Sequence, residues 1–374
     1  MAAEWTQDEL LRYSRHFALP EFGSSGQERL RNSAVLVVGA GGLGCPLLMY
    51  LAAAGVGRIG IIDPDAVSLS NLHRQVLYTS EDLGRPKAEV AAKRLAALNP
   101  HVEFEVFVEA LLPGNALELV SRYDVIADGA DNFATRYLVN DACVLTGKIN
   151  AYAALYRMEG QVSVFNYPLE VDRRSANYRD LYPDPPPPEL VPNCEEGGVL
   201  GVLPGIIGAI QAAEVIKVLS GVGEPLVDKL LLWDVATHRQ QLISIPKQPG
   251  LVIEKLIFYE QLCASLVTKP ATQTMEHEIK PETLRSWLNE GKDIQLIDIR
   301  EPYEFDELNI GGENIPMAEL PFQLERLQSG GPIILVCKTG SRSELAVKLL
   351  VDQYELKDVH RLIGGVEGYL VGEQ

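Results

Sequence analysis

The sequence predicts an α/β protein with two domains, and three observations support this fold class. In residues 34–44, AVLVVGAGGLG, an apolar run meets a glycine-rich turn, and a stretch of small residues suited to a helix follows. A connector over residues 247–276, which includes Pro249 and Gly250, interrupts the alternation of strands and helices. A second alternation of strands and helices then fills residues 277–374. We therefore expect a larger domain over residues 1–246 and a smaller one after the connector.

Composition limits the classes of partner. The net charge of −18 argues against nucleic acid and against an anionic membrane, because either needs a basic face. No uninterrupted apolar run approaches the length of a membrane span, and the first residues do not resemble a signal peptide. The cysteines are scattered, never in a CxxC pair, and odd in number: Cys45, Cys143, Cys194, Cys263 and Cys337. That pattern suits reduced thiols, so we expect a cytoplasmic protein.

The glycine-rich turn has the layout of a nucleotide-binding loop. Residues 35–38 read as a buried strand, a helix is expected over residues 45–54, and the next strand, residues 58–62, ends in Asp63. The glycines Gly39, Gly41 and Gly44 have G-x-G-x-x-G spacing, which places free N–H groups of a helix N-terminus toward an anion. A plain glycine turn is the alternative. The order of strand, turn, helix, strand and acid favours a nucleotide, without saying which one.

The segments around this core carry further polar residues in suggestive positions. Residues 5–32 look helical, with a turn over residues 23–27. Asn71 and Arg74 are three residues apart, so one helical turn would place both on one side. Pro86 suits the first position of a helix, which puts Lys87 in the first turn, where the helix dipole disfavours a cation. Such a misplaced charge indicates either function or an unimportant surface position.

A pair of carboxylates follows the next predicted strand. Strands are expected over residues 102–108 and 124–127, with an amphipathic helix around Leu117 between them. Asp128 and Asp131 would then lie beyond the carboxyl end of a strand, where open α/β sheets bind their ligands. Carboxylates near phosphates suit Mg²⁺. Each residue alone could instead be a helix cap or part of a turn.

Taken together, the glycine loop, Asp63, the pattern N-x-x-R-Q from Asn71 to Gln75, Lys87 and the pair Asp131–Asn132 closely resemble the ubiquitin-activating-enzyme-like adenylyltransferases of the MoeB/ThiF branch. The resemblance covers roughly residues 5–246, and N-x-x-R-Q is not part of an NAD site. It implies a Rossmann-like ATP-binding domain. Such enzymes activate the C-terminal glycine carboxylate of a small ubiquitin-like sulfur carrier as an acyl-adenylate.

The resemblance also implies roles for individual residues. Asp63 would hold the ribose, Asn71, Arg74 and Lys87 would bind the triphosphate, and Asp131 would hold Mg²⁺. Arg15 matches an arginine that the family contributes across a dimer interface, which implies a homodimer. The nucleotide site would thus comprise Arg15, Gly39, Gly41, Gly42, Gly44, Asp63, Asn71, Arg74, Lys87, Asp131 and Asn132. Preorganised cations and a metal would do most of the catalysis, because the reaction brings a carboxylate to a phosphate.

A proline-rich crossover between residues 167 and 202 carries Cys194, where sulfur-transferring family members have a reactive cysteine. We favour that role over a buried structural thiol. The family often has a structural zinc held by two CxxC pairs. Here the matching positions are Asn177, Asp180, Leu251 and Glu254, so we expect no structural zinc site.

The second domain is organised around another cysteine. Helices are expected over residues 281–288, around Leu324 and from Ser343, and strands over residues 294–299 and 333–336. The last strand runs into Cys337 and the loop CKTGSR, whose converging N–H groups would stabilise a thiolate or persulfide. Cysteine phosphatases need Cys-x5-Arg, whereas this Cys-x4-Arg loop leaves room for a sulfur atom. The domain resembles a rhodanese, from DIREPYEF to IGGVEGY, although the usual His before NIP is absent and Asn309 lies nearby.

Both resemblances in this order match fusions of a MoeB-like adenylyltransferase with a rhodanese. They imply an adenylyltransferase and sulfurtransferase that uses ATP and Mg²⁺. It would convert the Gly-Gly terminus of a carrier to a thiocarboxylate, with sulfur from a persulfide donor such as a cysteine desulfurase. The catalytic residues would be Arg74, Lys87, Cys194 and Cys337. The pathway stays open among molybdopterin, thiamin, thionucleotide and amino-acid biosynthesis.

The sequence leaves three alternatives. The first is an NAD-dependent oxidoreductase, which only the glycine loop supports. The second is a conjugating enzyme that passes the carrier on as a Cys194 thioester, although conjugation has no use for sulfane sulfur. The third is an inactive scaffold, which the full set of phosphate-contacting residues disfavours.

Overall fold

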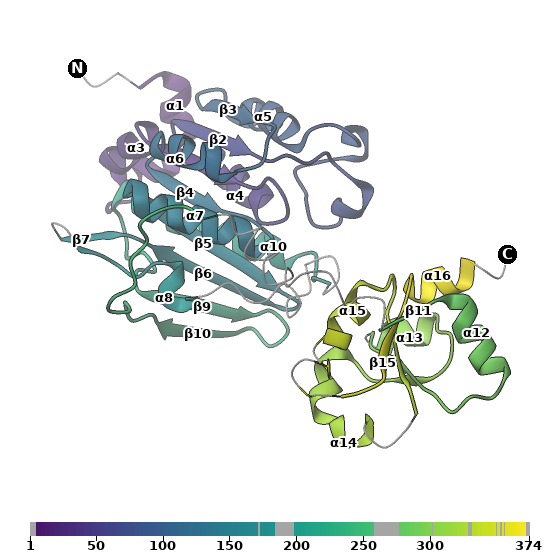
Figure 1. Cartoon of the computed structure of the whole chain (residues 1–374). Helices are drawn as coiled ribbons and strands as arrows, with labels where there is room; N and C mark the ends of the chain where they lie inside the picture. Colours follow the sequence, from purple (N-terminus) through teal and green to yellow (C-terminus); the bar gives the residue numbers. More distant parts are fainter. Residues whose placement is uncertain are drawn as a thin grey trace. The chain divides into compact units, whose positions relative to one another are not determined.

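A computed structural model describes residues 5–170, 173–183, 198–257, 277–300, 302–327, 331–348, 350–351, 354 and 356–371 of the chain. The chain separates into two compact units, residues 1–264 and residues 265–374 (Figure 1). Both units are α/β, as the sequence predicts.

The first unit is built on an eight-stranded sheet with the order β10-β9-β6-β5-β4-β1-β2-β3. Five strands run parallel: β1 (Ala34–Val38), β2 (Arg58–Ile62), β3 (Glu103–Phe107), β4 (Val125–Asp128) and β5 (Ile149–Tyr156). Three antiparallel strands extend it: β6 (Glu159–Phe165), β9 (Lys229–Asp234) and β10 (Arg239–Ser244). The carboxyl ends of β1, β2 and β4 therefore meet at one edge of the sheet, because neighbouring parallel strands end on the same side.

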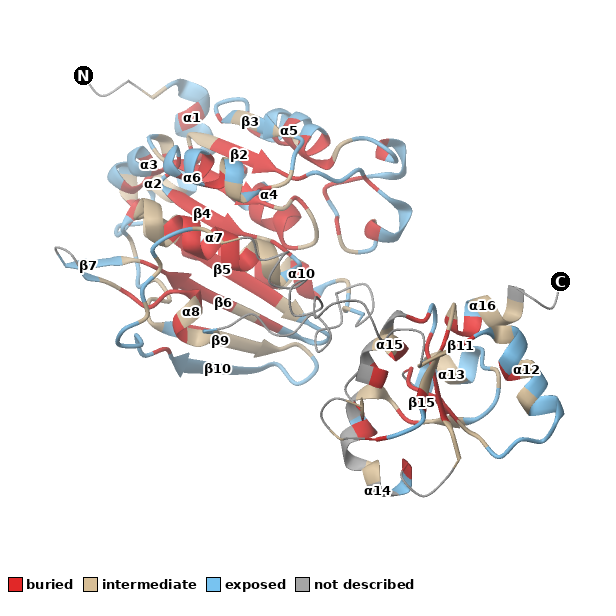
Figure 2. Ribbon diagram, viewed as in Figure 1, coloured by how far each residue is buried: buried red, intermediate tan, exposed pale blue. Residues whose placement is uncertain are grey.

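Two layers of helices cover the parallel part of the sheet, and alternate residues of each strand face one layer or the other. Val35 and Val37 of β1 pack with α3 (Gly23–Arg31), α4 (Gly44–Ala54), α5 (Lys87–Leu98) and α10 (Leu203–Ser220). Leu36 and Val38 pack on the other side with α6 (Pro113–Ser121), α7 (Phe133–Thr146) and α8 (Tyr178–Leu181). The central strands are buried on both faces, whereas every residue of the edge strand β10 is exposed (Figure 2). Burial on both faces explains why the strands read as unbroken apolar runs.

Most expected elements of this unit are confirmed. The helices α4 and α6, and the strands β1 to β4, lie within one or two residues of the ranges expected from the sequence. The N-terminal segment is helical, with α1 (Gln7–Arg12) and α2 (Ser14–Phe17). The turn expected over residues 23–27 was wrong, because α3 begins at Gly23. The glycine there has a positive φ of 53°, so it introduces the helix and does not interrupt it.

The helix α10 is long and apolar enough to cross a membrane by length and composition alone, and half of that stretch is buried inside the unit. Its Gln211 is fully buried, and the side-chain Nε2 donates to the carbonyl oxygens of Asp128 and Ala151, both at 2.8 Å. These bonds attach α10 to β4 and β5, which is the position of a core helix. A small ribbon of β7 (Pro168–Glu170) and β8 (Arg173–Arg174) lies apart from the main sheet.

The second unit has a five-stranded parallel sheet with the order β11-β15-β14-β12-β13. Its strands are β11 (Glu278–Ile279), β12 (Gln295–Asp298), β13 (Glu313–Asn314), β14 (Ile333–Val336) and β15 (Val359–Leu362). The helices of this unit are α12 (Pro281–Asn289), α13 (Pro302–Glu307), α14 (Leu324–Leu327), α15 (Ser341–Lys348) and α16 (Gly365–Val371). Apolar side chains form a cluster on each face of the sheet. The strand β14 lies in the middle of the sheet, so the loop after it starts from a rigid element.

Candidate active sites

The glycine loop between β1 and α4 is packed too tightly for side chains at two positions. Gly39 has a φ of 93°, and a Cβ there would lie 2.9 Å from the carbonyl oxygen of Gly129. A Cβ on Gly44 would lie 2.0 Å from the carbonyl oxygen of Gly39. At Gly41 a Cβ would meet only the side-chain Nε2 of Gln75, at 3.6 Å. The loop backbone is thus open at Gly41 just before the N-terminus of α4, which suits the approach of a phosphate.

Gly42 has a different neighbour. A Cβ on it would lie 3.2 Å from the Cβ of Pro204 in α10. The structure therefore places Gly42 against a helix of the core.

Asp63 follows β2 and braces this loop. Its side chain is nearly buried, its Oδ2 accepts from the backbone N–H of Ala40 at 2.7 Å, and its Oδ1 accepts from the N–H of Asp65 at 2.8 Å. Burial raises the pKa of the carboxyl group, while the bond from Ala40 and the nearby cation of Lys87 oppose that shift. The structure brings Asp63 to the glycine loop, and its expected contact with a ribose stays a prediction.

The three residues expected to bind the triphosphate lie on the segment after β2. A single 3-10 turn covers Leu69–Asn71, and the N–H of Arg74 donates to the carbonyl oxygen of Asn71 at 3.0 Å. The guanidinium of Arg74 donates to the carbonyl oxygen of Ser70 at 3.1 Å and lies 2.8 Å from Nε2 of His73. Asn71 and Arg74 are thus joined by one backbone turn, and their expected contacts with a triphosphate stay a prediction.

The helix α5 begins at Lys87. Pro86 therefore lies just before the helix and not at its first position, where it was expected. The side chain of Lys87 is 6% exposed, and its Nζ lies 2.8 Å from Oδ2 of Asp65. A side chain this buried is not part of a solvated surface, and the expected contact of Lys87 with a triphosphate stays a prediction. Asp65 itself was not singled out from the sequence, although its spacing from Asp63 was a visible signal.

The two carboxylates expected beyond β4 have different environments. Asp128 is the last residue of β4 and is fully buried, so the expectation that it lies beyond the strand was wrong. Burial raises its pKa to about 6, against the opposing effect of Arg136. Asp131 is exposed, and Asn132 next to it caps α7 through a bond from the N–H of Thr135 at 2.9 Å. Of the pair, Asp131 therefore remains the candidate ligand for Mg²⁺.

The residues around the glycine loop fit a nucleotide with its metal. The open loop backbone at Gly41, the cation of Lys87 and the exposed carboxylate of Asp131 are the groups that a triphosphate and Mg²⁺ need. Arg15 lies exposed on α2. Cys194 lies outside the described residues.

The positions that would hold the family's zinc do not fit a zinc ion. Both oxygens of the Asp180 carboxylate are occupied: Oδ2 accepts from the backbone N–H and from Nδ2 of Asn177, each at 2.7 Å, and Oδ1 accepts from the N–H of Gln248 at 2.6 Å. Leu251 offers no ligand atom, and Glu254 is exposed. Within the described residues, no three His, Cys, Asp or Glu side chains are grouped for a metal.

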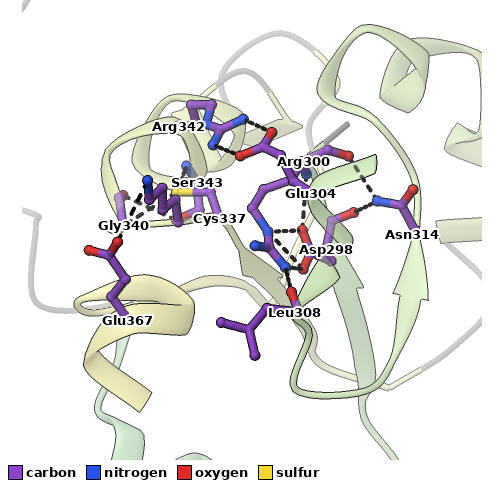
Figure 3. Close-up of polar contacts among 11 residues, drawn as sticks. Asp298, Arg300, Glu304, Leu308, Asn314, Cys337, Gly340, Arg342, Ser343 and Glu367 are labelled. Atoms are coloured by element: carbon purple, nitrogen blue, oxygen red, sulfur yellow. Dashed lines mark hydrogen bonds and ion pairs between the residues drawn. The ribbon is translucent and has the colours of Figure 1, made fainter. Parts of the chain in front are cut away.

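In the second unit, Cys337 follows β14 and its side chain is 1% exposed. Its Sγ accepts from the backbone N–H of Gly340 at 3.2 Å and from that of Ser343 at 3.4 Å, while the hydroxyl of Ser343 lies at 3.6 Å (Figure 3). The loop around the sulfur thus supplies the converging N–H groups expected from the sequence. Two such donors stabilise a negative charge on sulfur.

The arginine of this loop is bound to a carboxylate. Arg342 Nη1 and Nη2 each lie 2.8 Å from an oxygen of Glu304, which α13 contributes (Figure 3). In the same unit, the buried Asp298 at the end of β12 forms an ion pair with the buried Arg300, in which Oδ2 lies 2.6 Å from Nη2. A carboxylate that neutralises the guanidinium argues against an anionic phosphate substrate, in agreement with the shorter loop. Glu304 is a further residue that the sequence did not single out.

The fold and the two loops define the class of protein: an α/β enzyme with a glycine loop suited to a nucleotide on its first unit and a cysteine-centred loop on its second. The ThiF family model matches residues 13–251, and the rhodanese-like domain model matches residues 280–371. The chain belongs to the ThiF family and carries a C-terminal rhodanese-like domain, as the resemblance indicated.

Curated relatives extend over both units. The chain is 44% identical to "Probable adenylyltransferase/sulfurtransferase MoeZ" of Mycobacterium tuberculosis, over 98% of this chain and 94% of the relative. It is 40% identical to "Adenylyltransferase and sulfurtransferase MOCS3" of Danio rerio, over 92% and 80%. It is 50% identical to "Sulfur carrier protein adenylyltransferase" of Thermus thermophilus, over 69% of this chain and 98% of the relative.

Solved structures share the fold of the first unit. PaaA aligns with a TM-score of 0.56 and 24% identity over 66% of this chain and 77% of that one. Escherichia coli MccB aligns with a TM-score of 0.56 and 23% identity over 67% and 74%.

Proposed function

We propose that this protein uses ATP and Mg²⁺ to adenylate the C-terminal glycine of a ubiquitin-like sulfur carrier and then converts it to a thiocarboxylate. The observation that carries the proposal is the presence, in one chain, of an anion-binding glycine loop beside Lys87 and of Cys337 with two N–H donors to its sulfur. Relatives that span both units are named for the same two activities. An adenylate makes a carboxylate reactive, and a persulfide is the nucleophile that uses it.

The first step joins the carrier carboxylate to the α-phosphorus of ATP and releases pyrophosphate. Both reactants are anions, so the site must lower their repulsion. Lys87 and Arg74 supply fixed positive charge and Asn71 supplies a polar contact, while Asp131 would hold the Mg²⁺, which would supply further positive charge against the phosphates. The N–H groups before α4 bind phosphate oxygens, and Asp63 takes the ribose.

The second step moves sulfur. A persulfide donor, such as a cysteine desulfurase, transfers its outer sulfur to Cys337. The terminal sulfur of Cys337 attacks the acyl-adenylate carbonyl, AMP leaves, and an acyl disulfide forms between carrier and Cys337. The thiolate of Cys194 then attacks Sγ of Cys337, which releases the thiocarboxylate and leaves a Cys194–Cys337 disulfide. A thiol reductant restores both cysteines.

Several finer features belong to the same proposal. The family resemblance of Arg15 supports a homodimer in which this side chain completes the partner's nucleotide site. The scattered cysteines support a cytoplasmic protein, and the net charge of −18 supports partners other than nucleic acid or membrane. Molybdenum cofactor biosynthesis is the pathway we favour, because the names MoeZ and MOCS3 belong to relatives that span both units.

Thiocarboxylate formation is the direct test. Purified protein, a carrier ending in Gly-Gly, ATP, Mg²⁺ and a persulfide donor should yield carrier in which one terminal oxygen is replaced by sulfur, as read by intact-mass spectrometry. Carrier bound to Cys194 as a thioester would instead support conjugation.

A further inference from the structure

The carboxylate of Asp131 has little to hold it in place by itself. The side chain is exposed, and its Oδ1 lies 3.4 Å from Nδ2 of Asn132, which is a long hydrogen bond. The position of this carboxylate therefore depends on the backbone on either side of it. On the C-terminal side, Asn132 is fixed as the cap of α7.

On the N-terminal side, two buried charged residues hold the peptide groups of Ala130. The N–H of Ala130 donates to Oδ1 of Asp128 at 3.0 Å, and Nη2 of Arg136 donates to the carbonyl oxygen of Ala130 at 2.8 Å. Asp128 is fully buried and Arg136 is 6% exposed. Burying two charges is costly, so placing both against one residue's backbone calls for a reason.

Arg136 is itself held in a defined direction. It lies one turn into α7, its Nη1 donates to the hydroxyl of Tyr152 at 3.2 Å, and its guanidinium carbon lies 5.5 Å from the centre of the Tyr152 ring. The planar guanidinium makes these contacts at fixed angles, which an ammonium group cannot reproduce. A pivot of the 129–131 loop would have to break the bond to Ala130.

The same loop touches the glycine loop. A Cβ on Gly129 would lie 3.1 Å from the carbonyl oxygen of Val38 and 3.3 Å from that of Gly39. Holding Ala130 in place therefore holds Asp131 in register with the phosphate-binding backbone.

We propose that Arg136 and Asp128 are positioning residues that hold Asp131 in a fixed place beside the glycine loop, where its carboxylate would hold the Mg²⁺ that accompanies ATP. This inference rests on the proposed role of Asp131. The energetic coupling between Mg²⁺ and ATP binding is the quantity that these residues control. A fixed ligand contributes more to such coupling than a mobile one, because less freedom is lost on binding.

The test measures that coupling by calorimetry, with no chemistry required. The Kd for ATP is determined with Mg²⁺ and again with EDTA, and the ratio of the two values is compared between variants. Arg136→Lys keeps the charge but loses the planar guanidinium with its several donors. The ratio of the Kd for ATP in EDTA to the Kd with Mg²⁺ should therefore fall about five- to tenfold, while the Kd in EDTA stays near that of the wild type.

A matched control exists further along α7. Arg179 lies on α8 and binds the buried Asp141 of α7 through two bonds of 2.9 and 3.0 Å, and Asp141 lies further along α7 than Arg136. Arg179→Lys should disturb packing to a similar degree and leave the Mg²⁺ coupling unchanged. A loss of coupling equal to that of Arg136→Lys would overturn the inference.

Asp128 gives a second, independent comparison. Asp128→Asn keeps an oxygen that can accept from the N–H of Ala130, whereas Asp128→Leu removes it. The coupling should fall in Asp128→Leu and be largely restored in Asp128→Asn, and equal coupling in both would contradict the inference. Absence of ATP–pyrophosphate exchange in the wild type would instead refute the proposed function, so the two failures are distinguishable.

Discussion

The ammonium group of Lys87 lies 2.8 Å from the carboxylate of Asp65, and the two partners are exposed very differently, at 6% and 63% of their side-chain areas. A pair with one solvated partner is weak and exchanges readily. Asp65 can therefore keep the buried cation in position and release it when a phosphate arrives.

Lys87→Ala should reduce ATP–pyrophosphate exchange by at least about a hundredfold, because a fixed charge that faces the reacting phosphates is lost. Asp131→Ala should have a comparable effect, with the remaining exchange shifted to higher Mg²⁺. Persulfide loading at Cys337 should be unchanged, since the second unit does not use these residues, and circular dichroism with thermal unfolding checks that the first unit of each variant is folded. Undiminished exchange in both variants would refute the assigned roles.

Replacing Cys337 and replacing Cys194 should block sulfur transfer at different steps. Cys337→Ala should keep pyrophosphate exchange and form no thiocarboxylate, because the persulfide has no cysteine sulfur to form on. Cys194→Ala should also keep exchange and, without external thiol, accumulate carrier joined to Cys337 by a disulfide. Non-reducing mass spectrometry identifies the species. Normal thiocarboxylate yield from Cys194→Ala without thiol would remove Cys194 from the relay.

Asp128 predicts a pH dependence of stability. Its pKa rises from the ordinary 3.8 to about 6 on folding, so the folded state binds more protons than the unfolded state between these values. The contribution of Asp128 to the free energy of unfolding is therefore fully present below its unfolded pKa of 3.8, and it is lost as the pH rises through the folded pKa of about 6. Two pKa units correspond to about 3 kcal/mol at most.

Asp128→Asn imitates the protonated carboxyl at every pH and should remove this dependence. Relative to the wild type, the variant should gain up to about 2–3 kcal/mol of unfolding free energy between pH 4 and pH 7.5. Urea unfolding at several pH values, followed by tryptophan fluorescence in a Trp287→Phe background so that only Trp5 and Trp233 of the first unit report, measures the difference. A constant difference between variant and wild type would contradict the raised pKa.

Metal analysis tests the zinc prediction. Purified protein should contain no stoichiometric zinc, and EDTA should leave its Tm unchanged, because hydrogen bonds to Asp180 join residues 177–180 to Gln248. Asp180→Ala should lower stability by about 1–3 kcal/mol through the loss of buried hydrogen bonds. Stoichiometric zinc in the wild type would mean that other residues supply the ligands.

Local pattern was enough to predict the architecture. The apolar run into Gly39, the helix expected over residues 45–54 and the strand that ends before Asp63 are contiguous signals, and hydrophobic periodicity reports them directly. The same holds for β14 and the loop from Cys337. The expected turn at residues 23–27 failed because glycine and serine are common at helix starts as well as in turns.

The pairing of side chains was decided only by tertiary structure. Residue pattern placed Asp128 and Asp131 together beyond a strand, and only the family resemblance chose Asp131 for Mg²⁺; burial at the end of β4 gives the physical difference between them. Arg136 gave no signal, because an arginine in a helix is ordinary until its contact with Ala130 is seen. Glu304 and Arg342 are 38 residues apart, and they meet because α13 lies beside the loop after β14. Sequence by itself determined the fold class, the strands and helices on either side of the glycine loop and the loop from Cys337, since these depend on neighbours along the chain. Which charges meet depends on packing between distant segments, and that is where the candidate sites acquire their geometry.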